Sequence, residues 1–478
     1  MTALHRRSGI AAIVASLALL VVAARLPFLG NLLIDEEGCF AYLVLGPAPV
    51  IHGDIGIFQG RIDGVDRLLS AERNPLPYWF LDRIVRPTLG RSDLEGMSIA
   101  EISRAARLPF FALFLGGAAM VLVVLWRHMT SAAADRRVAA ALVSAYALTT
   151  PLAVGGSIQP QLDGGLGVLL AGAAGGTLLL IRTGRRALRV GGGLLAGFVA
   201  GLAKTEWAIA LAATILAGMV LFWIVGRGRE RDRESRPING DVEVVAAALV
   251  GLAVALAAVA LVAPEAMAGG FSIARRAGSA GPGVGFVLRR QIRFMYPAVA
   301  LGIIAAVVLL PHLREMLRRE LAVAVIAAWG AAICTAYLLA GWMGDGFPRY
   351  YMPGIILLTL AAVVGLARLD VTARIRRAVA SACLLGLAVN AVTLTERAVA
   401  GRSITSVPGA PLAAIEARFA DNARRFAAEP QVFLDFVSFG IYHRNVDFVG
   451  LNLGADGARF WVERWKPGFS GALVPPDR

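Results

Sequence analysis

Long apolar runs alternate with short polar stretches along most of the 478-residue chain. Runs of about 18 or more apolar residues are typical of helices that cross a membrane. We expect eleven such spans, the short fifth one forming a tight pair with its successor. They cover residues 9–30, 109–126, 138–156, 162–181, 190–203, 206–225, 242–263, 295–311, 321–341, 353–367 and 379–395. The pattern therefore predicts an all-α polytopic membrane protein.

The composition agrees with this class. Hydrophobic residues make up 57% of the chain, and the mean hydropathy of +0.67 is far above that of soluble globular proteins. The formal net charge is +14, and the basic residues fall mostly between the spans. We therefore expect membrane lipids, and no nucleic acid, as partners. Cys39, Cys334 and Cys383 are far apart and form no C-x-x-C pair, which predicts neither a zinc site nor a disulfide framework.

Arginine-rich connections fall on one side of the predicted bundle. They precede the first span and lie at 127–137, 182–189, 227–236, 314–319 and 368–377. The positive-inside rule assigns this side to the cytoplasm. We therefore expect a cytoplasmic N-terminus that begins with an uncleaved signal anchor and, with an odd number of spans, a C-terminus outside. The arginine bias and the outer-face features favour a bacterial inner membrane.

Two loops on the outer face are unusual. Residues 31–108 form a first periplasmic loop that is too long for a simple connector and contains segments predicted to be interfacial helices. Residues 264–294 carry Arg275, Arg276 and Arg293 among several arginines, against the positive-inside bias. These arginines bind either lipid headgroups or a phosphate-bearing ligand.

The C-terminal part of the chain has a different pattern. From residue 396, an amphipathic helix pattern precedes the strand-like runs Q-V-F-L-D-F and V-D-F-V-G-L. We predict a transmembrane module at 1–395 and a small outside α/β domain at 396–478.

An acidic cluster follows the first apolar run directly. Asp35, Glu36 and Glu37 precede a second apolar stretch, G-C-F-A-Y-L-V-L. They are either the solvated end of a helix, where acids complement the helix dipole, or carboxylates in a partly desolvated pocket. In such a pocket a carboxylate acts as a general base or holds a divalent cation such as Mg²⁺ or Mn²⁺.

Three further charged residues lie at outer ends of spans. Asp163 is either a helix-capping acid or a residue that faces a cavity. Lys204, one of only two lysines in the chain, either pairs with Glu206 or holds a phosphate. Arg349, in G-F-P-R-Y-Y-M-P, is either a snorkelling arginine in an aromatic belt or part of a rigid anion-binding corner together with Tyr350.

The order of these motifs along most of the chain resembles that of the GT-C glycosyltransferases. Within that class it is similar to the branch of the protein O-mannosyltransferases and the lipid A aminoarabinose transferases. Asp35-Glu36 matches the acidic pair after the first span, and N-P-L-P-Y at 74–78 is similar to an H-P-P-L-Y-type element. F-G-I-Y-H-R at 439–444 looks like the F-Y-x-x-R stretch of the C-terminal domain. Asn74 stands where that family usually has histidine.

The resemblance implies a transferase that uses a polyprenyl-phosphate-linked sugar on the outer face of the membrane and passes the sugar to a glycan, lipid or protein acceptor. Asp35 would be the general base of an inverting reaction, and Glu36 would support it or bind a cation. The residues implied for the donor phosphate are Lys204, Arg349, Arg275, Arg276 and Arg293. Those implied for the acceptor or sugar pocket are Asp163, Asn74, Tyr78 and Tyr350.

Two other functions fit a polytopic membrane protein. A lipid or glycolipid transporter would have paired repeats and charges near the middle of its spans, whereas the predicted spans are almost uncharged there. A scaffold of envelope assembly would not need the acidic pair and Lys204. Both alternatives stay open at the level of sequence.

Overall fold

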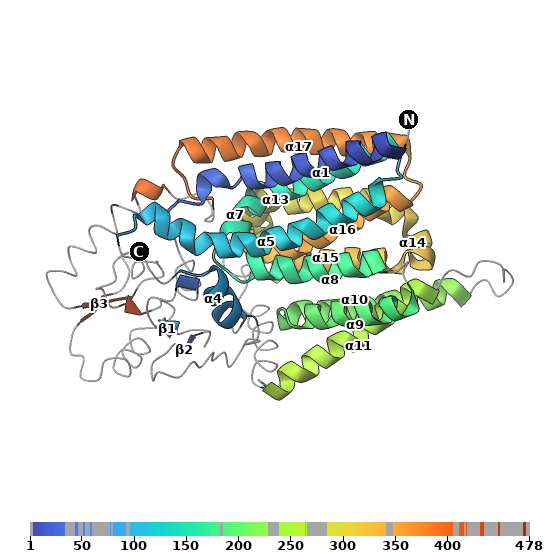
Figure 1. Ribbon diagram of the computed structural model, residues 1–478, viewed down its shortest axis with the longest axis horizontal. Coiled ribbons are helices and arrows are strands. Elements are labelled where there is room, and N and C mark those ends of the chain that lie inside the picture. The colour runs from blue at the N-terminus through green and yellow to red at the C-terminus, as the bar shows by residue number, and fades with distance from the viewer. Residues whose placement is uncertain are drawn as a thin grey trace.

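The structure is a computed structural model, which describes residues 3–33, 44–45, 51–52, 58–59, 77, 80–91, 96–181, 185–227, 239–262, 264, 284–340, 348–404, 411–414, 417, 431–434, 448–449 and 472–474. Within these residues the fold is dominated by long helices that lie side by side (Figure 1). The N-terminus and α14 lie at one end of the bundle, and β1, β2 and β3 lie at the other. We call the second end the strand end.

The helical elements follow the predicted spans closely. They are α1 (Ala3–Ala23), η1 (Leu26–Phe28), η2 (Leu81–Val85), α4 (Arg86–Leu89), α5 (Ile99–Met129), α6 (Ala134–Thr149), α7 (Pro151–Ile158), η3 (Asp163–Gly167), α8 (Val168–Ile181), α9 (Arg186–Gly201), α10 (Thr205–Arg227), α11 (Asn239–Val262), α13 (Val284–Leu309), η4 (Leu310–His312), α14 (Leu313–Arg319), α15 (Leu321–Ala340), η5 (Pro348–Tyr351), α16 (Met352–Arg368) and α17 (Ala373–Val399).

The predicted fold class is confirmed. Among the residues described, eight helices are long and apolar enough to cross a membrane, and the bent pair α6–α7 makes a ninth. The other two predicted spans coincide with α9, of 16 residues, and α15, of 20 residues. Each of the eleven predicted spans is thus a helix or the bent pair.

Local sequence signals explain where two of these helices begin and bend. A capping box opens α5: Ser98 accepts a hydrogen bond from the backbone N–H of Glu101, whose side chain binds the backbone N–H of Ser98. The sequence predicted one straight span at 138–156, but α6 and α7 meet at an angle of 55°. The Thr150 hydroxyl accepts a hydrogen bond from the Ala153 N–H and Pro151 opens α7, so the helix restarts there.

The core of the bundle surrounds α16. Residues Met352 to Leu366 of this helix are all buried, whereas α1 and α17 lie at the edge of the bundle, where few of their residues are buried and several apolar ones are exposed (Figure 1). In a membrane protein this exposed apolar surface faces lipid.

The prediction that α9 pairs tightly with its successor names the wrong partner. α9 packs most closely on α11 instead of α10. A Cβ at Gly197 of α9 would lie 1.8 Å from the backbone oxygen of Ala248 on α11. Small residues thus let the two backbones approach closely, as is common between membrane helices.

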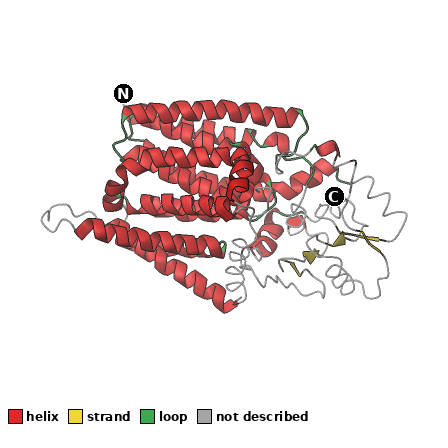
Figure 2. Ribbon diagram, turned by 180° about the vertical axis from the view of Figure 1, so that it is seen from behind, coloured by secondary structure: helices red, strands yellow, loops and turns green. Residues whose placement is uncertain are grey.

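Short strands lie at the strand end (Figure 2). β1 (Ile51–His52) and β2 (Phe58–Gln59) form an antiparallel pair. β3 (Gln431–Leu434) pairs in parallel with both β4 (Phe448–Val449) and β5 (Ala472–Val474), in the order β4-β3-β5. The sequence predicted strands at β3 and β4 but neither β5 nor the β1–β2 pair. A separate domain at 396–478 stays a prediction.

Candidate functional site

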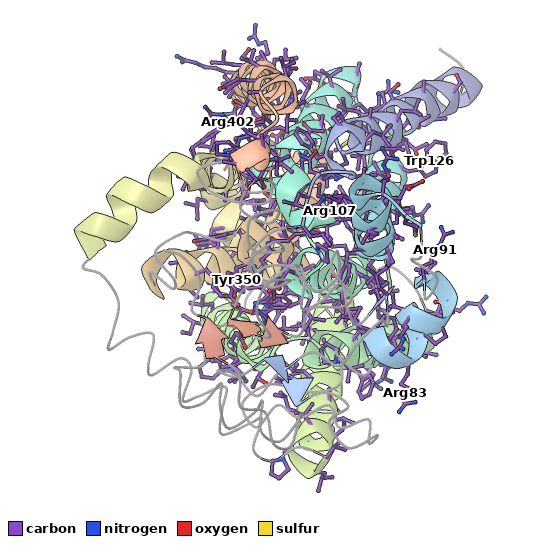
Figure 3. The ribbon with its side chains drawn as sticks, turned by 90° about the vertical axis from the view of Figure 1, so that its left-hand side faces the viewer. Arg83, Arg91, Arg107, Trp126, Tyr350 and Arg402 are labelled. Atoms are coloured by element: carbon purple, nitrogen blue, oxygen red, sulfur yellow. The ribbon has the colours of Figure 1, made fainter. Side chains whose placement is uncertain are left out.

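Three connections between helices meet within the bundle. The first joins α7 to η3, the second joins α9 to α10, and the third is η5, between α15 and α16. The elements α7, η3 and η5 pack against one another. Figure 3 views the molecule from the strand end and labels Tyr350 of η5.

Asp163 opens the π-helical turn η3, and its side chain is buried, with 4% exposure. Glycines around it allow close packing: a Cβ at Gly164 would lie 1.5 Å from the backbone oxygen of Gly156 on α7. π-Helical turns inside membrane helices are often found at functional sites. The turn therefore holds a carboxylate inside the protein, where it needs compensating charge.

Two cations compensate Asp163. Lys204 Nζ lies 2.6 Å from Asp163 Oδ1, and Arg349 Nε lies 3.8 Å from Asp163 Oδ2. The Arg349 side chain is 1% exposed and that of Lys204 is 14% exposed. We call Asp163, Lys204 and Arg349 the charge cluster; it carries one negative and two positive charges.

Tyr350 lies against both cations of this cluster. Its ring centre is 4.6 Å from Lys204 Nζ and 4.7 Å from the Arg349 guanidinium carbon. Its hydroxyl accepts a hydrogen bond from Arg349 Nη2 at 3.1 Å. Cations over an aromatic face are attracted by its quadrupole, so one ring stabilises both positive charges.

The chemical consequence is that a lysine and an arginine are held close together inside the protein, on the two oxygens of one carboxylate. A phosphate group fits this arrangement, since lysine and arginine are its usual ligands. The Asp163 carboxylate itself is engaged by both cations and does not suit the role of a general base.

The chain shares its overall structure with a solved protein. The crystal structure of ArnT from Cupriavidus metallidurans in the apo state aligns with 98% of this chain and 93% of its own, with a TM-score of 0.54 and 16% identity. The chain has the GT-C fold. This confirms the architecture that the sequence motifs predicted, and at 16% identity the likeness extends to the fold alone. No family model and no curated protein matches the sequence.

The structure brings together four of the predicted site residues, namely Asp163, Lys204, Arg349 and Tyr350. It pairs Lys204 with Asp163 instead of Glu206, whose Oε1 accepts a hydrogen bond from the Tyr337 hydroxyl. The interpretation of Arg349 as a snorkelling arginine is also wrong, because its side chain is buried inside the protein.

The other predicted site residues cannot be assigned a geometry. Arg293 belongs to α13, but its side chain lies outside the described residues. Those that lie wholly outside them are Asp35, Glu36, Asn74, Tyr78, Arg275 and Arg276.

The predicted divalent cation has no ligand set in the part of the chain that the structure describes. No group of three or more His, Cys, Asp or Glu side chains there could hold a metal ion. Asp163 already serves two cations and does not fit a metal ligand. A cation at Asp35 and Glu36 stays a prediction, and we assign no reaction step to it.

Two buried arginines were missed by the sequence analysis. Arg25 and Arg107 are 0% and 1% exposed. Both occur in the same hexapeptide, A-A-R-L-P-F, which stands at 23–28 and again at 105–110. This repeat, with an arginine at the outer end of each of the first two spans, is the signal that identifies them.

Arg107, in the second hexapeptide, binds the backbone at the end of the first hexapeptide and just after it. Arg107 Nη1 donates to the carbonyl oxygens of Phe28, Leu29 and Asn31, and Nη2 donates to that of Leu32 at 3.1 Å. A cation near exposed carbonyls at a helix end is favourable. Arg107 therefore fixes the path of the chain where it leaves α1 at the strand end (Figure 3).

Arg25 holds the bend between α6 and α7. Its Nε donates to the Ser157 hydroxyl at 2.6 Å, and its Nη2 donates to the carbonyl oxygens of Leu148 and Ala153 at 2.9 and 3.3 Å. The guanidinium also lies 4.4 Å from the ring centre of Phe114. The bend frees carbonyls from the helical pattern, and Arg25 supplies their hydrogen bonds.

An apolar cavity of about 460 Å³ lies between α13, α15 and α16. Small residues such as Gly302, Ala327 and Ala331 line it, and it extends from Met316 of α14 to Tyr351 of η5. The cavity thus runs along the bundle, and its lining residue Tyr351 is adjacent in sequence to Tyr350, which contacts the charge cluster.

Proposed function

We propose that the protein is an integral membrane glycosyltransferase. It would transfer a sugar from a polyprenyl-phosphate donor to a lipid, polysaccharide or protein acceptor, with inversion at the anomeric carbon and Asp35 as general base. The observation that carries this proposal is the charge cluster, which holds a lysine and an arginine, the usual ligands of phosphate, close together within a GT-C fold.

The leaving group of such a reaction is a polyprenyl phosphate, on which negative charge grows as the glycosidic bond breaks. Lys204 and Arg349 are held by Asp163 and Tyr350 before any ligand arrives. Fixed cations of this kind stabilise developing charge without reorganising during the reaction. The cluster therefore supplies the electrostatic part of the proposed catalysis.

The polyprenyl tail would occupy the apolar cavity. Its lining is almost entirely hydrophobic, as a hydrocarbon chain requires, and its end at Tyr351 adjoins the residue that contacts both cations. A ligand with a long apolar tail and a phosphate head matches this sequence of environments.

Two buried residues on either side of the acidic pair support a role for it at this site. Leu33 and Val44, on either side of the acids, are buried in the same hydrophobic cluster as Leu162 and Leu166, which flank Asp163. Because two residues of chain span at most about 7 Å, the burial of Leu33 in this hydrophobic cluster supports Asp35 as a residue of the proposed site.

In the proposed reaction, the acceptor hydroxyl oxygen attacks the anomeric carbon from the side opposite the phosphate. The bond between that carbon and the phosphate oxygen breaks, and polyprenyl phosphate leaves with the electron pair. Asp35 takes the proton of the hydroxyl, which makes the oxygen a better nucleophile in the transition state. Glu36 would support Asp35.

We further infer a bacterial inner-membrane location with the strand end outside. The arginines of α14 lie at the end of the bundle that carries the N-terminus, which supports a cytoplasmic assignment of that end (Figure 1). Polyprenyl-phosphate sugars would then meet the charge cluster on the outer face.

The test is donor consumption by the purified protein. We would supply a panel of polyprenyl-phosphate sugars with native membranes and follow donor and sugar-labelled product by mass spectrometry. We expect one donor to be consumed, and Asp35→Ala to lower the rate by about 100-fold or more, as for loss of a general base. Glu37→Gln removes a neighbouring acid charge without a proposed role and is the matched control, which should keep its activity.

Other outcomes reject the proposal. If no donor in the panel is consumed, the transferase assignment fails for those sugars, and if Asp35→Ala equals the wild type, Asp35 is not the base. Movement of a labelled polyprenyl-phosphate lipid across liposomes by the wild type, without donor consumption, would favour the transporter instead.

A further inference from the structure

An aromatic stack connects the charge cluster to α15. The Tyr337 ring lies parallel to the Tyr350 ring, with 5.0 Å between centres and 14° between planes, and Tyr351 meets Tyr337 edge-on at 6.1 Å. Tyr350 in turn contacts the cations of both Lys204 and Arg349. A shift of Tyr337 would therefore move the ring on which both cations rest.

The Tyr337 hydroxyl also binds the connection that carries Lys204. It accepts a hydrogen bond from Trp207 Nε1 at 3.0 Å and donates one to Glu206 Oε1 at 3.2 Å. Trp207 is also bound by Trp329 of α15, whose Nε1 donates a hydrogen bond to the Trp207 carbonyl oxygen at 3.0 Å. The Trp207 ring is 5.4 Å from Lys204 Nζ.

Tyr337 thus contacts both sides of the cluster. Its ring face reaches the η5 side, which carries Arg349, and its hydroxyl reaches the start of α10, which Lys204 directly precedes. Because the Tyr337 ring is rigid and both of its ends are bound, it fixes the distance between the η5 side and the start of α10.

We propose that Tyr337 is a positioning residue that sets the spacing of Lys204 and Arg349 for a phosphate group, with Glu206 as the anchor of its hydroxyl. This rests on the proposed phosphate site of the transferase. Tyr337 does not itself touch the phosphate; it acts through Tyr350 and through the connection at Lys204.

The test compares binding of polyprenyl phosphate with binding of the uncharged polyprenol. The two ligands share the tail and differ in the phosphate, so the ratio of their affinities reports on the cations alone. We would measure both by ligand-dependent thermal shift of the full chain in detergent. The variants are Tyr337→Phe, which keeps the ring and loses both hydrogen bonds, and Glu206→Gln, which removes the charge of the anchor.

We expect Tyr337→Phe to lower the affinity for polyprenyl phosphate about fivefold to tenfold, which is the effect of about one hydrogen bond. The affinity for polyprenol should stay within about twofold of the wild type. Glu206→Gln should act in the same direction with a smaller effect. Tyr146→Phe removes one hydrogen bond from a buried tyrosine hydroxyl to the Pro297 carbonyl, away from the cluster, and should change neither affinity. It is the matched control.

A purely structural role would lower the melting temperature and leave the ratio of affinities unchanged. If Tyr337→Phe leaves the ratio of affinities unchanged while Lys204→Met and Arg349→Met lower it, the inference about Tyr337 is overturned and the proposed phosphate site stands. If these two variants leave the ratio unchanged, or the wild type does not prefer the phosphate, the proposed phosphate site itself fails and the inference fails with it.

Discussion

Replacing Asp163 by asparagine removes the anion of the charge cluster while keeping the size of the side chain. The two cations that it serves, Lys204 and Arg349, are then left buried together. At an effective dielectric constant of about 20, Coulomb attraction amounts to about 6 kcal/mol across 2.6 Å and about 4 kcal/mol across 3.8 Å, before desolvation is subtracted. Breaking a buried pair by removing one partner typically costs about 3–5 kcal/mol.

We therefore expect Asp163→Asn to lower the melting temperature of the protein in detergent by about 5 °C or more. Asp370→Asn is the matched control, because Asp370 pairs with Arg136 at 3.6 Å on the surface, where its side chain is 98% exposed. Exposed pairs contribute about 0–1 kcal/mol, so this variant should melt near the wild type.

The double variant Asp163→Asn with Lys204→Met separates charge from packing. It restores the net charge of the cluster to that of the wild type, since one anion and one cation are removed together. We expect the double variant to be more stable than the sum of the single effects predicts, by about 1–3 kcal/mol. Added polyprenyl phosphate should stabilise Asp163→Asn more than the wild type, because the phosphate replaces the lost carboxylate.

Two results would refute this reasoning. If Asp163→Asn melts with the wild type, the carboxylate does not compensate the cations. If the single effects add, Asp163 and Lys204 are not coupled, and the short distance between them has no energetic meaning.

Three further predictions follow from other contacts. Arg107→Lys keeps the charge but loses the forked guanidinium that reaches four carbonyls. The rate of sugar transfer should therefore fall about tenfold while donor binding is retained. A loss of donor binding by about tenfold as well would contradict a role limited to the chain after α1. Gly197→Val forces a side chain against the Ala248 carbonyl and should abolish monodisperse protein in size-exclusion chromatography, whereas Gly191→Ala, with open space around it, should behave as wild type. Ala331→Phe fills the apolar cavity and should weaken polyprenyl-phosphate binding about tenfold in the thermal-shift assay, and unchanged affinity would place the tail elsewhere.

The helical fold was predictable because each span buries or exposes to lipid a long apolar run, which local sequence reveals. Breaks inside such runs were harder to predict. Thr150 and Pro151 lie in a long stretch without charged residues, so mean hydropathy alone did not reveal the 55° bend between α6 and α7. Likewise, α9 was paired with its neighbour in sequence, whereas its glycines fit α11.

The site was predictable in its parts but not in its assembly. Asp163, Lys204 and Arg349 each stood out as a charge at the edge of a span, and the resemblance grouped Lys204 with Arg349 but did not predict that Asp163 binds both. Their meeting depends on how three separate connections pack, which is a tertiary property. Tyr337 did not stand out at all, because an aromatic residue in an apolar helix is ordinary until its hydroxyl is seen to bind Glu206.

The hydrogen bonds of Arg25 join parts of the chain that are synthesised far apart in time. Arg25 follows the first membrane helix, whereas Leu148 and Ser157, which bind it, come 123 and 132 residues later. The hydrogen bonds that join the end of α1 to the bend between α6 and α7 therefore form only after at least 123 further residues have been synthesised.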